Sequence, residues 1–152
     1  MVKSINFDMD GTIANLYGVE GWLDKLENED ATPYRDAKVM HNMSKLAVYL
    51  NKAQARGIEI NIITWLSKGA TTNYNIKVAQ AKREWLNKHL PSVKFNNIYI
   101  IPYGVPKSTC IKGEGIHLLF DDEIGNINEW HNAHIGYAFT PDNLFGNLPK
   151  LF

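Results

Sequence analysis

Residues 3–14 read Lys-Ser-Ile-Asn-Phe-Asp-Met-Asp-Gly-Thr-Ile-Ala, and this stretch decides the fold. Ile5 and Phe7 belong to a short, mostly apolar run that predicts a buried strand. The run ends at Asp8, Asp10 follows two residues later, and a Gly-Thr pair then indicates a turn. Burying a carboxylate costs several kcal/mol unless it has a partner, and Mg²⁺ is a suitable partner because it prefers carboxylate oxygens. The alternative is a turn in which either aspartate accepts hydrogen bonds from nearby backbone N–H groups.

The rest of the chain alternates apolar runs with helical patterns. Strands are predicted over 58–63, 97–101, 116–120 and 135–139, and helices over 19–26, 34–56, 73–90 and 123–132. This alternation predicts an α/β fold: a doubly wound, Rossmann-like and mostly parallel sheet of about five strands with helices on both faces. We expect one domain over residues 1–152, with a mostly irregular tail from residue 140.

Composition and charge narrow the functional classes. The formal net charge is zero, so a general attraction to nucleic acid is not favoured. Residues 20–30 are mostly acidic and residues 68–94 mostly basic, and we interpret both as solvated helix faces rather than recognition surfaces. The single cysteine, the lack of a signal-peptide pattern and the lack of a long apolar segment favour a cytoplasmic location without membrane association.

Polar side chains occur at or just beyond the carboxyl ends of four predicted strands, either at the last strand residue or in the loop that follows. Because the carboxyl ends of parallel strands meet at one edge of a sheet, we expect these side chains to lie together. Carboxylates, a hydroxyl and an ammonium group are what phosphoryl transfer through a covalent aspartyl-phosphate needs. The residues concerned are Asp8 and Asp10, Thr64 and Trp65, Lys107, and Asp121 and Asp122.

The order of these residues over positions 3–123 resembles the four motifs of the haloacid-dehalogenase-like (HAD) phosphatase superfamily. The resemblance implies that Asp8 is the nucleophile that becomes phosphorylated. It implies that Asp10 protonates the leaving oxygen and then activates water. Thr64, the Trp65 backbone N–H and Lys107 would contact the phosphoryl oxygens, and Lys107 would also reduce repulsion between Asp8 and the phosphoryl group.

The same resemblance implies a Mg²⁺ cofactor. Its ligands would be Asp8, the backbone carbonyl of Asp10, Asp121 and Asp122, with one of the last two acting through water. The sequence leaves open which of Asp121 and Asp122 ligates directly. It also leaves the oligomeric state open.

Substrate choice in this superfamily resides largely in cap insertions, and this chain has little room for one. About 47 residues separate Asp10 from the second predicted strand, and a helix and a loop use most of them. We therefore expect no large cap domain and a site that is open or lightly covered by residues 15–33.

The second half of the chain resembles the 5′-nucleotidase and 5′(3′)-deoxyribonucleotidase group in residues 63–65, 107–109 and 119–123. This resemblance implies a small phosphate ester, such as a nucleotide 5′-monophosphate, as substrate. A nucleobase would stack on aromatic residues near the site, although simple packing explains them equally well. These aromatic residues are Tyr17, Trp22, Trp65 and Tyr103.

Two alternatives remain. An open site beside the basic 68–94 segment would suit a nucleic-acid end phosphatase. A non-catalytic, metal-binding domain would keep the fold without the reaction.

Overall fold

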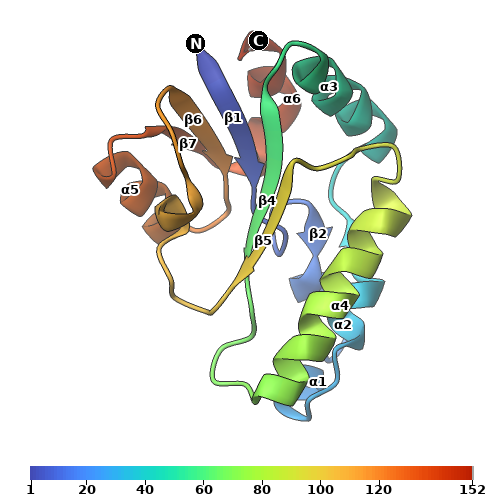
Figure 1. Cartoon of the computed structure of the whole chain (residues 1–152). Helices are drawn as coiled ribbons and strands as arrows, with labels where there is room; N and C mark the ends of the chain where they lie inside the picture. The colour runs from blue at the N-terminus through green and yellow to red at the C-terminus, as the bar shows by residue number, and fades with distance from the viewer. Residues whose placement is uncertain (152) are drawn as a thin grey trace.

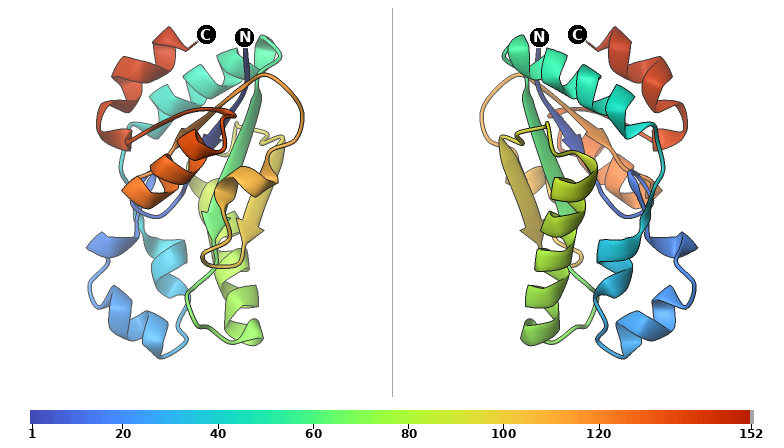
Figure 2. Two further views of the ribbon diagram at one scale, coloured as in Figure 1. Left: turned by 90° about the vertical axis from the view of Figure 1, so that its left-hand side faces the viewer. Right: turned by 90° about the vertical axis from the view of Figure 1, so that its right-hand side faces the viewer.

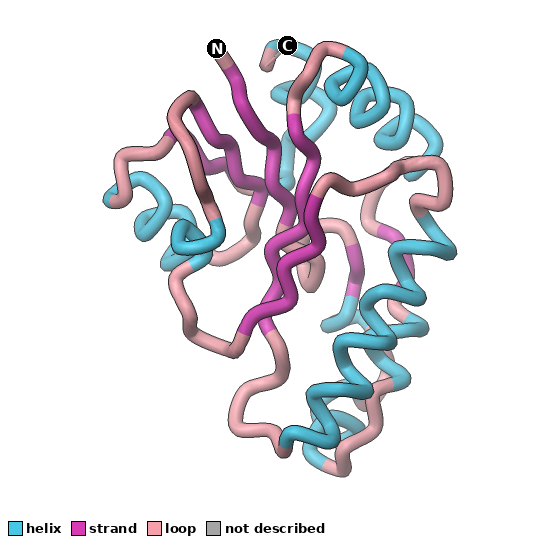
Figure 3. Tube along the Cα trace, in the orientation of Figure 1, coloured by secondary structure: helices cyan, strands magenta, loops and turns pink. Residues whose placement is uncertain are grey.

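The computed structural model describes residues 1–151, and within them five strands form one parallel sheet in the order β5-β4-β1-β6-β7 (Figures 1 and 3). The strands are β1 (Val2–Phe7), β4 (Glu59–Trp65), β5 (Asn97–Ile101), β6 (Ile116–Phe120) and β7 (Gly136–Phe139), and β2 (Ala14–Asn15) pairs antiparallel with β3 (Lys38–Val39). The helices are α1 (Trp22–Glu27), α2 (Thr32–Asp36), α3 (Met43–Ala55), α4 (Thr72–His89), α5 (Ile124–Asn132) and α6 (Leu144–Asn147). Short 3₁₀ turns span Leu16–Gly18, Lys107–Cys110, Pro141–Asn143 and Leu148–Lys150.

Side chains alternate between the two faces of this sheet, and helices cover both. One face packs against α3, α4 and α6 through an apolar core that includes Phe7, Leu50 and Trp85. The other face packs against α5 through a smaller cluster that includes Leu119 and Trp130. The doubly wound α/β fold expected from the sequence is therefore confirmed.

A ladder of polar side chains crosses the sheet on the α5 face. The amide of Asn97 donates to Asn61, the amide of Asn61 donates to Asn6, and the amide of Asn6 donates to the hydroxyl of Ser4, at 3.1, 2.9 and 2.9 Å. The Ser4 hydroxyl lies 2.7 Å from Nδ1 of His117 on β6. Since the asparagines are paired in register on β1, β4 and β5, and His117 lies on β6, the ladder joins four neighbouring strands of the sheet.

The helix predicted over 34–56 is wrong, because the chain breaks there into α2, β3 and α3. The backbone of β3 pairs with β2, and the Met40 N–H donates to the Ile13 carbonyl at 3.0 Å. A new helix then begins after Asn42, whose side chain accepts from the Lys45 N–H. Pairing with the turn after β1 therefore overrides the helical periodicity of this segment.

Two further expectations need correction. The tail from residue 140 was expected to be irregular, but it forms α6 between two short 3₁₀ turns, and it buries Leu144 and Leu148 in the core. The basic residues of the 68–94 stretch were interpreted as a solvated helix face, but Lys82 on α4 is fully buried. Within residues 1–151, no helix has both the length and the apolarity needed to cross a membrane.

Residues 16–36 and the first half of α4 extend together beyond the carboxyl ends of the strands (Figure 2). A second apolar cluster joins them, with Leu16 and Tyr34 packed against Tyr74 and Val78 of α4. The Tyr74 hydroxyl also donates to the Asp30 carbonyl at 3.0 Å. The segment that the sequence offered as a minimal cover is thus packed on a long helix.

We predict that Asn6→Leu destabilises the protein through the polar ladder. The substitution leaves the buried amide of Asn61 without its acceptor and removes a donor to the Ser4 hydroxyl, and an unpaired buried group costs about 1–3 kcal/mol. Urea unfolding measures the loss, with Asn87→Leu on the exposed side of α4 as the control. Equal stability of the two variants would show that the ladder contributes nothing.

Candidate active site

The turn after β1 presents Asp8 at the edge of the sheet. The Asp8 N–H still donates to the Phe120 carbonyl of β6. Beyond it the chain turns, and the N–H groups of residues 12–14 all donate to the Met9 carbonyl. The Thr12 hydroxyl donates to Asp8 Oδ2 at 3.0 Å. Gly11 has a φ of +82°, and a Cβ there would collide with the carboxylate of Asp122. Glycine is therefore required both by the backbone conformation and by the close approach of the two strand ends.

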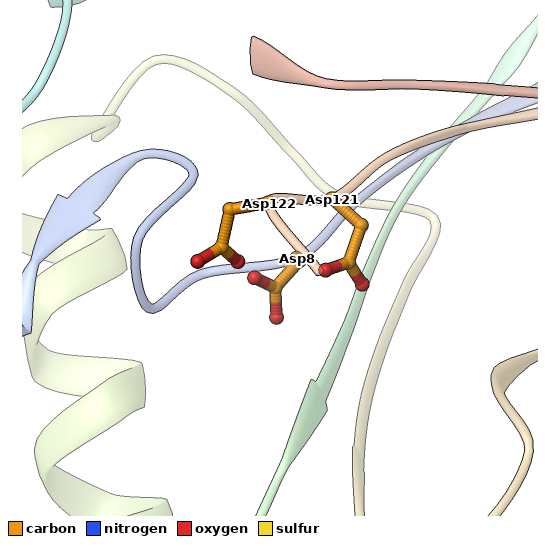
Figure 4. A group of neighbouring side chains, drawn as sticks. All are labelled: Asp8, Asp121 and Asp122. Atoms are coloured by element: carbon orange, nitrogen blue, oxygen red, sulfur yellow. The ribbon is translucent and has the colours of Figure 1, made fainter. Parts of the chain in front are cut away.

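The end of β6 brings two more carboxylates to the same place. Asp121 and Asp122 follow the last residue of the strand, and carboxylate oxygens of Asp8, Asp121 and Asp122 all lie within 4.8 Å of one another (Figure 4). Asp121 is fully buried, and it accepts from the Glu123 N–H and from the Asn126 amide at 3.0 Å each. Its orientation is thus fixed by the start of α5.

Lys107 joins the two strand ends. Its Nζ lies 2.8 Å from Asp8 Oδ1 and 2.8 Å from Asp121 Oδ2, and the residue is 1% exposed. The 3₁₀ turn that carries Lys107 is held on α5 by Glu129, which accepts from the backbone N–H and the hydroxyl of Ser108. The ring of Trp65 lies beneath the ammonium group, 5.4 Å from Nζ to the ring centroid.

The charges of this group are unbalanced. Burial alone would lower the pKa of Lys107, but Asp8 and Asp121 outweigh it and raise that pKa above its usual range. Burial and the Asp8 carboxylate raise the pKa of Asp121 to about 6 and that of Asp122 to about 8. One ammonium therefore does not neutralise three neighbouring carboxylates, and the site favours a proton or a further cation.

Asp10 lines the same cavity, but its carboxylate does not belong to this group of three. Its Oδ2 lies 2.9 Å from Nζ of Lys82, and its side chain is 18% exposed. Burial raises the pKa of Asp10, against the attraction of Lys82. The carboxylate is therefore at the boundary between the cavity and the protein interior.

Thr64 lies behind Asp10 rather than on the cavity surface. It is fully buried, and its hydroxyl accepts from Lys82 at 2.6 Å. Trp65, the next residue, does line the cavity, and its indole N–H donates to the Val105 carbonyl at 2.8 Å. The proposed contact of Thr64 with a phosphoryl group stays a prediction.

A cavity of about 410 Å³ opens from the carboxylates toward residues 16–34. Two aromatic pairs stand on it: Tyr17 against Trp22, with ring centroids 5.1 Å apart, and Trp65 against Tyr103, at 4.9 Å. Both pairs thus come from the residues that the sequence offered as stacking partners.

Sequence reasoning missed several polar residues near the site, and three of them bring positive charge or a hydroxyl to it. Ser67 and Lys68 line the cavity in the loop after β4, and Lys82 contacts Asp10. The loop residues could have been found because they follow the carboxyl end of a predicted strand. Lys82 carried a weaker signal: it lies four residues after Val78 and three before Trp85, both buried, and so on the inward face of the helix.

The three carboxylates fit a hard divalent cation. Carboxylate oxygens that lie this close together form the ligand set that Mg²⁺ takes in proteins, and the raised pKa values of Asp121 and Asp122 show that positive charge is favoured there. Asp8 and Asp122 also face the cavity, so a bound ligand would reach the same point. Together with Lys107, the arrangement can hold an anion beside the Asp8 carboxylate.

Comparisons with known proteins show the fold but no family. No family model matches the chain, and no curated protein matches its sequence. Among solved structures, it is similar to D,D-heptose 1,7-bisphosphate phosphatase from Burkholderia thailandensis, with a TM-score of 0.60 and 11% identity. The alignment covers 98% of this chain and 97% of that one. At this identity the likeness establishes a shared α/β architecture over the whole chain.

Proposed function

We propose that this protein is a HAD-like, Mg²⁺-dependent phosphomonoester hydrolase that acts through an aspartyl-phosphate on Asp8. The observation that carries the proposal is the position of Lys107, which touches both Asp8 and Asp121 at 2.8 Å beside a third carboxylate. The architecture shared with a known phosphatase supports it. The order of the motifs along the chain supports it independently.

The chemistry follows from the positions of two aspartates. A carboxylate oxygen of Asp8 attacks phosphorus, and the bond from phosphorus to the ester oxygen breaks. Asp10, two residues along the same turn, gives its proton to the departing oxygen. Asp10 then takes a proton from water, which attacks the phosphorus and releases inorganic phosphate with Asp8 restored. Lys107 reduces the repulsion between Asp8 and the incoming dianion.

Mg²⁺ would be held by Asp8, Asp121 and Asp122, and the Asp10 backbone carbonyl is a further proposed ligand. When bound, it supplies positive charge that balances the phosphoryl oxygens. Asp121 is the more buried of the acidic pair and is already bonded to Lys107 and Asn126. Asp122, which lines the cavity, would ligate the ion directly or through a bound water.

We predict that Asp8→Asn abolishes turnover of p-nitrophenyl phosphate. Removal of a nucleophile that acts with its neighbours as a unit lowers kcat by on the order of 10³-fold or more. Wild-type protein quenched in acid during turnover should gain one phosphoryl group by intact-mass spectrometry, and Asp8→Asn should not. Asp142→Asn, at an exposed position near the C-terminus, is the control.

A wild-type level of phosphate release from Asp8→Asn would contradict the proposed mechanism. Absence of turnover in the wild-type protein, with binding of Mg²⁺ retained, would favour the non-catalytic metal-binding alternative.

We predict that Mg²⁺ binds more tightly at pH 8 than at pH 5. The folded pKa values of Asp121 and Asp122, about 6 and about 8, lie above the value of 3.8 for a free aspartate. Between pH 4 and pH 8 the metal-free folded state therefore holds more protons than the unfolded state, and stability falls as pH rises. Mg²⁺ displaces these protons, so its affinity grows over the same range.

The rise in melting temperature on adding Mg²⁺ measures this effect, with NaCl of equal ionic strength as the control. Asp122→Asn should reduce both the rise and its pH dependence. An identical rise at pH 5 and pH 8 would argue against a metal held by these carboxylates, and so would full phosphatase activity in EDTA.

The preferred substrate is a small phosphate ester with a flat group, such as a nucleotide 5′-monophosphate. Two aromatic pairs stand on the cavity, and stacking of a base on an aromatic ring contributes about 1–3 kcal/mol. Residues 15–33 supply the Tyr17–Trp22 pair and act in this proposal as a minimal cap over a single-domain enzyme. A nucleic-acid end phosphatase is the second candidate, because the cavity opens beside Lys68.

We predict that Tyr17→Ala raises KM for adenosine 5′-monophosphate roughly 5- to 150-fold, the equivalent of the stacking energy. KM for ribose 5-phosphate, which lacks the base, should hardly change. Tyr137→Ala, at an exposed position on β7, is the control. An equal loss on both substrates would contradict stacking, and a strong preference for a 5′-phosphorylated oligonucleotide at low salt would favour the second candidate.

A further inference from the structure

We propose that Lys82 is a positioning residue that holds the Asp10 carboxylate in place for proton transfer to the leaving group. This inference rests on the proposed function, because it assigns a role in the proton transfer made by Asp10. Lys82 lies on α4, between the second and third of the four stretches that resemble the HAD motifs and in neither of them.

The ammonium group of Lys82 makes three hydrogen bonds within the described residues, which is the number of its protons. Nζ donates to Asp10 Oδ2 at 2.9 Å, to Thr64 Oγ1 at 2.6 Å and to the Trp65 carbonyl at 2.7 Å. Two of these acceptors lie at the end of β4, and the third lies on the turn after β1. Since each acceptor fixes one direction, the position of Nζ is determined by the sheet, and Asp10 is held relative to the sheet.

Burial argues against a role in stability alone. The Lys82 side chain is 0% exposed, whereas that of Asp10 is 18% exposed and lines the cavity. Taking an ammonium out of water carries a penalty of several kcal/mol, and replacing a whole buried ion pair by well-packed apolar residues is often neutral or stabilising. The neighbouring inward positions of α4 are indeed occupied by Val78, Ala81 and Trp85. A partly solvated carboxylate does not need a buried partner in order to be accommodated.

Orientation is what the buried partner supplies. One oxygen of Asp10, Oδ2, is bound to Lys82, which leaves Oδ1 as the oxygen available to the cavity. A carboxyl group must present one oxygen to the leaving atom at hydrogen-bond distance to act as a general acid. Tyr34 of α2 closes the site from the other side, with its ring centroid 5.1 Å from Nζ. The lysine therefore also links the carboxylate to the segment that covers the cavity.

The test compares two substrates of similar shape that differ in their need for a proton. The p-nitrophenolate ion leaves without one, whereas phenolate leaves poorly unless it is protonated. The value of kcat/KM reports the steps up to the first irreversible one, so it is insensitive to later hydrolysis of the phosphoenzyme. We expect Lys82→Met to lower kcat/KM for phenyl phosphate at least roughly tenfold more than for p-nitrophenyl phosphate, a fraction of what a general acid contributes.

Two variants control for charge and for position. Lys82→Arg keeps a cation and should restore most of the kcat/KM for phenyl phosphate relative to p-nitrophenyl phosphate. Lys77→Met, on the exposed side of α4, should resemble the wild type. In an Asp10→Asn background, Lys82→Met should change the ratio of the two substrates no further, because the lysine acts through Asp10. Equal losses on both substrates, or no loss, would overturn the proposal.

Folding is checked by circular dichroism and melting temperature. If Lys82→Met does not fold, Lys82→Gln, which keeps a hydrogen-bond donor but no charge, makes the same comparison. Absence of activity on both substrates in the wild-type protein would contradict the proposed function itself, an outcome distinct from an unchanged substrate ratio in an active variant.

Discussion

Repulsion among three carboxylates at the ends of β1 and β6 is the constraint on which the rest of the structure depends. Asp8, Asp121 and Asp122 approach within 4.8 Å, and Lys107 neutralises part of their charge. The lysine is held there because its 3₁₀ turn is bonded to Glu129 of α5, and α5 in turn packs on the sheet through Trp130. The apolar packing of one helix thus maintains an arrangement of charges that would otherwise separate.

A second buried lysine, Lys82, neutralises the other aspartate of the turn after β1, Asp10. Lys82 connects α4 to β4 and to Asp10. The turn that follows β1 is therefore held at Asp8 by Lys107 and at Asp10 by Lys82. Both lysines are nearly inaccessible to solvent. The two aspartates of this turn are therefore held by separate ammonium groups, which allows each carboxylate a different environment and a different task.

The fold and most of the acidic group could be predicted because their signals are local. A buried apolar run that stops at a charged residue marks the end of a strand, and parallel strands bring such ends together. The environment of Lys82 could not be predicted in this way. A lysine in a basic helix looks solvated until its partner, Asp10, is known to lie beside it, and the two are 72 positions apart in the sequence. The break between α2 and α3 was missed for a similar reason, since the backbone bond from Met40 to Ile13 bridges segments that the periodicity does not connect.

The four tryptophans are divided between two environments. Trp85 and Trp130 are completely buried, and their indole N–H groups donate to the carbonyls of Ala37 and His117. Trp22 and Trp65 line the cavity. Intrinsic fluorescence consequently has two sources, one shielded from quenchers such as acrylamide and one that senses whatever occupies the space above Asp8. Occupancy of the cavity can therefore be followed optically, without a label and without turnover.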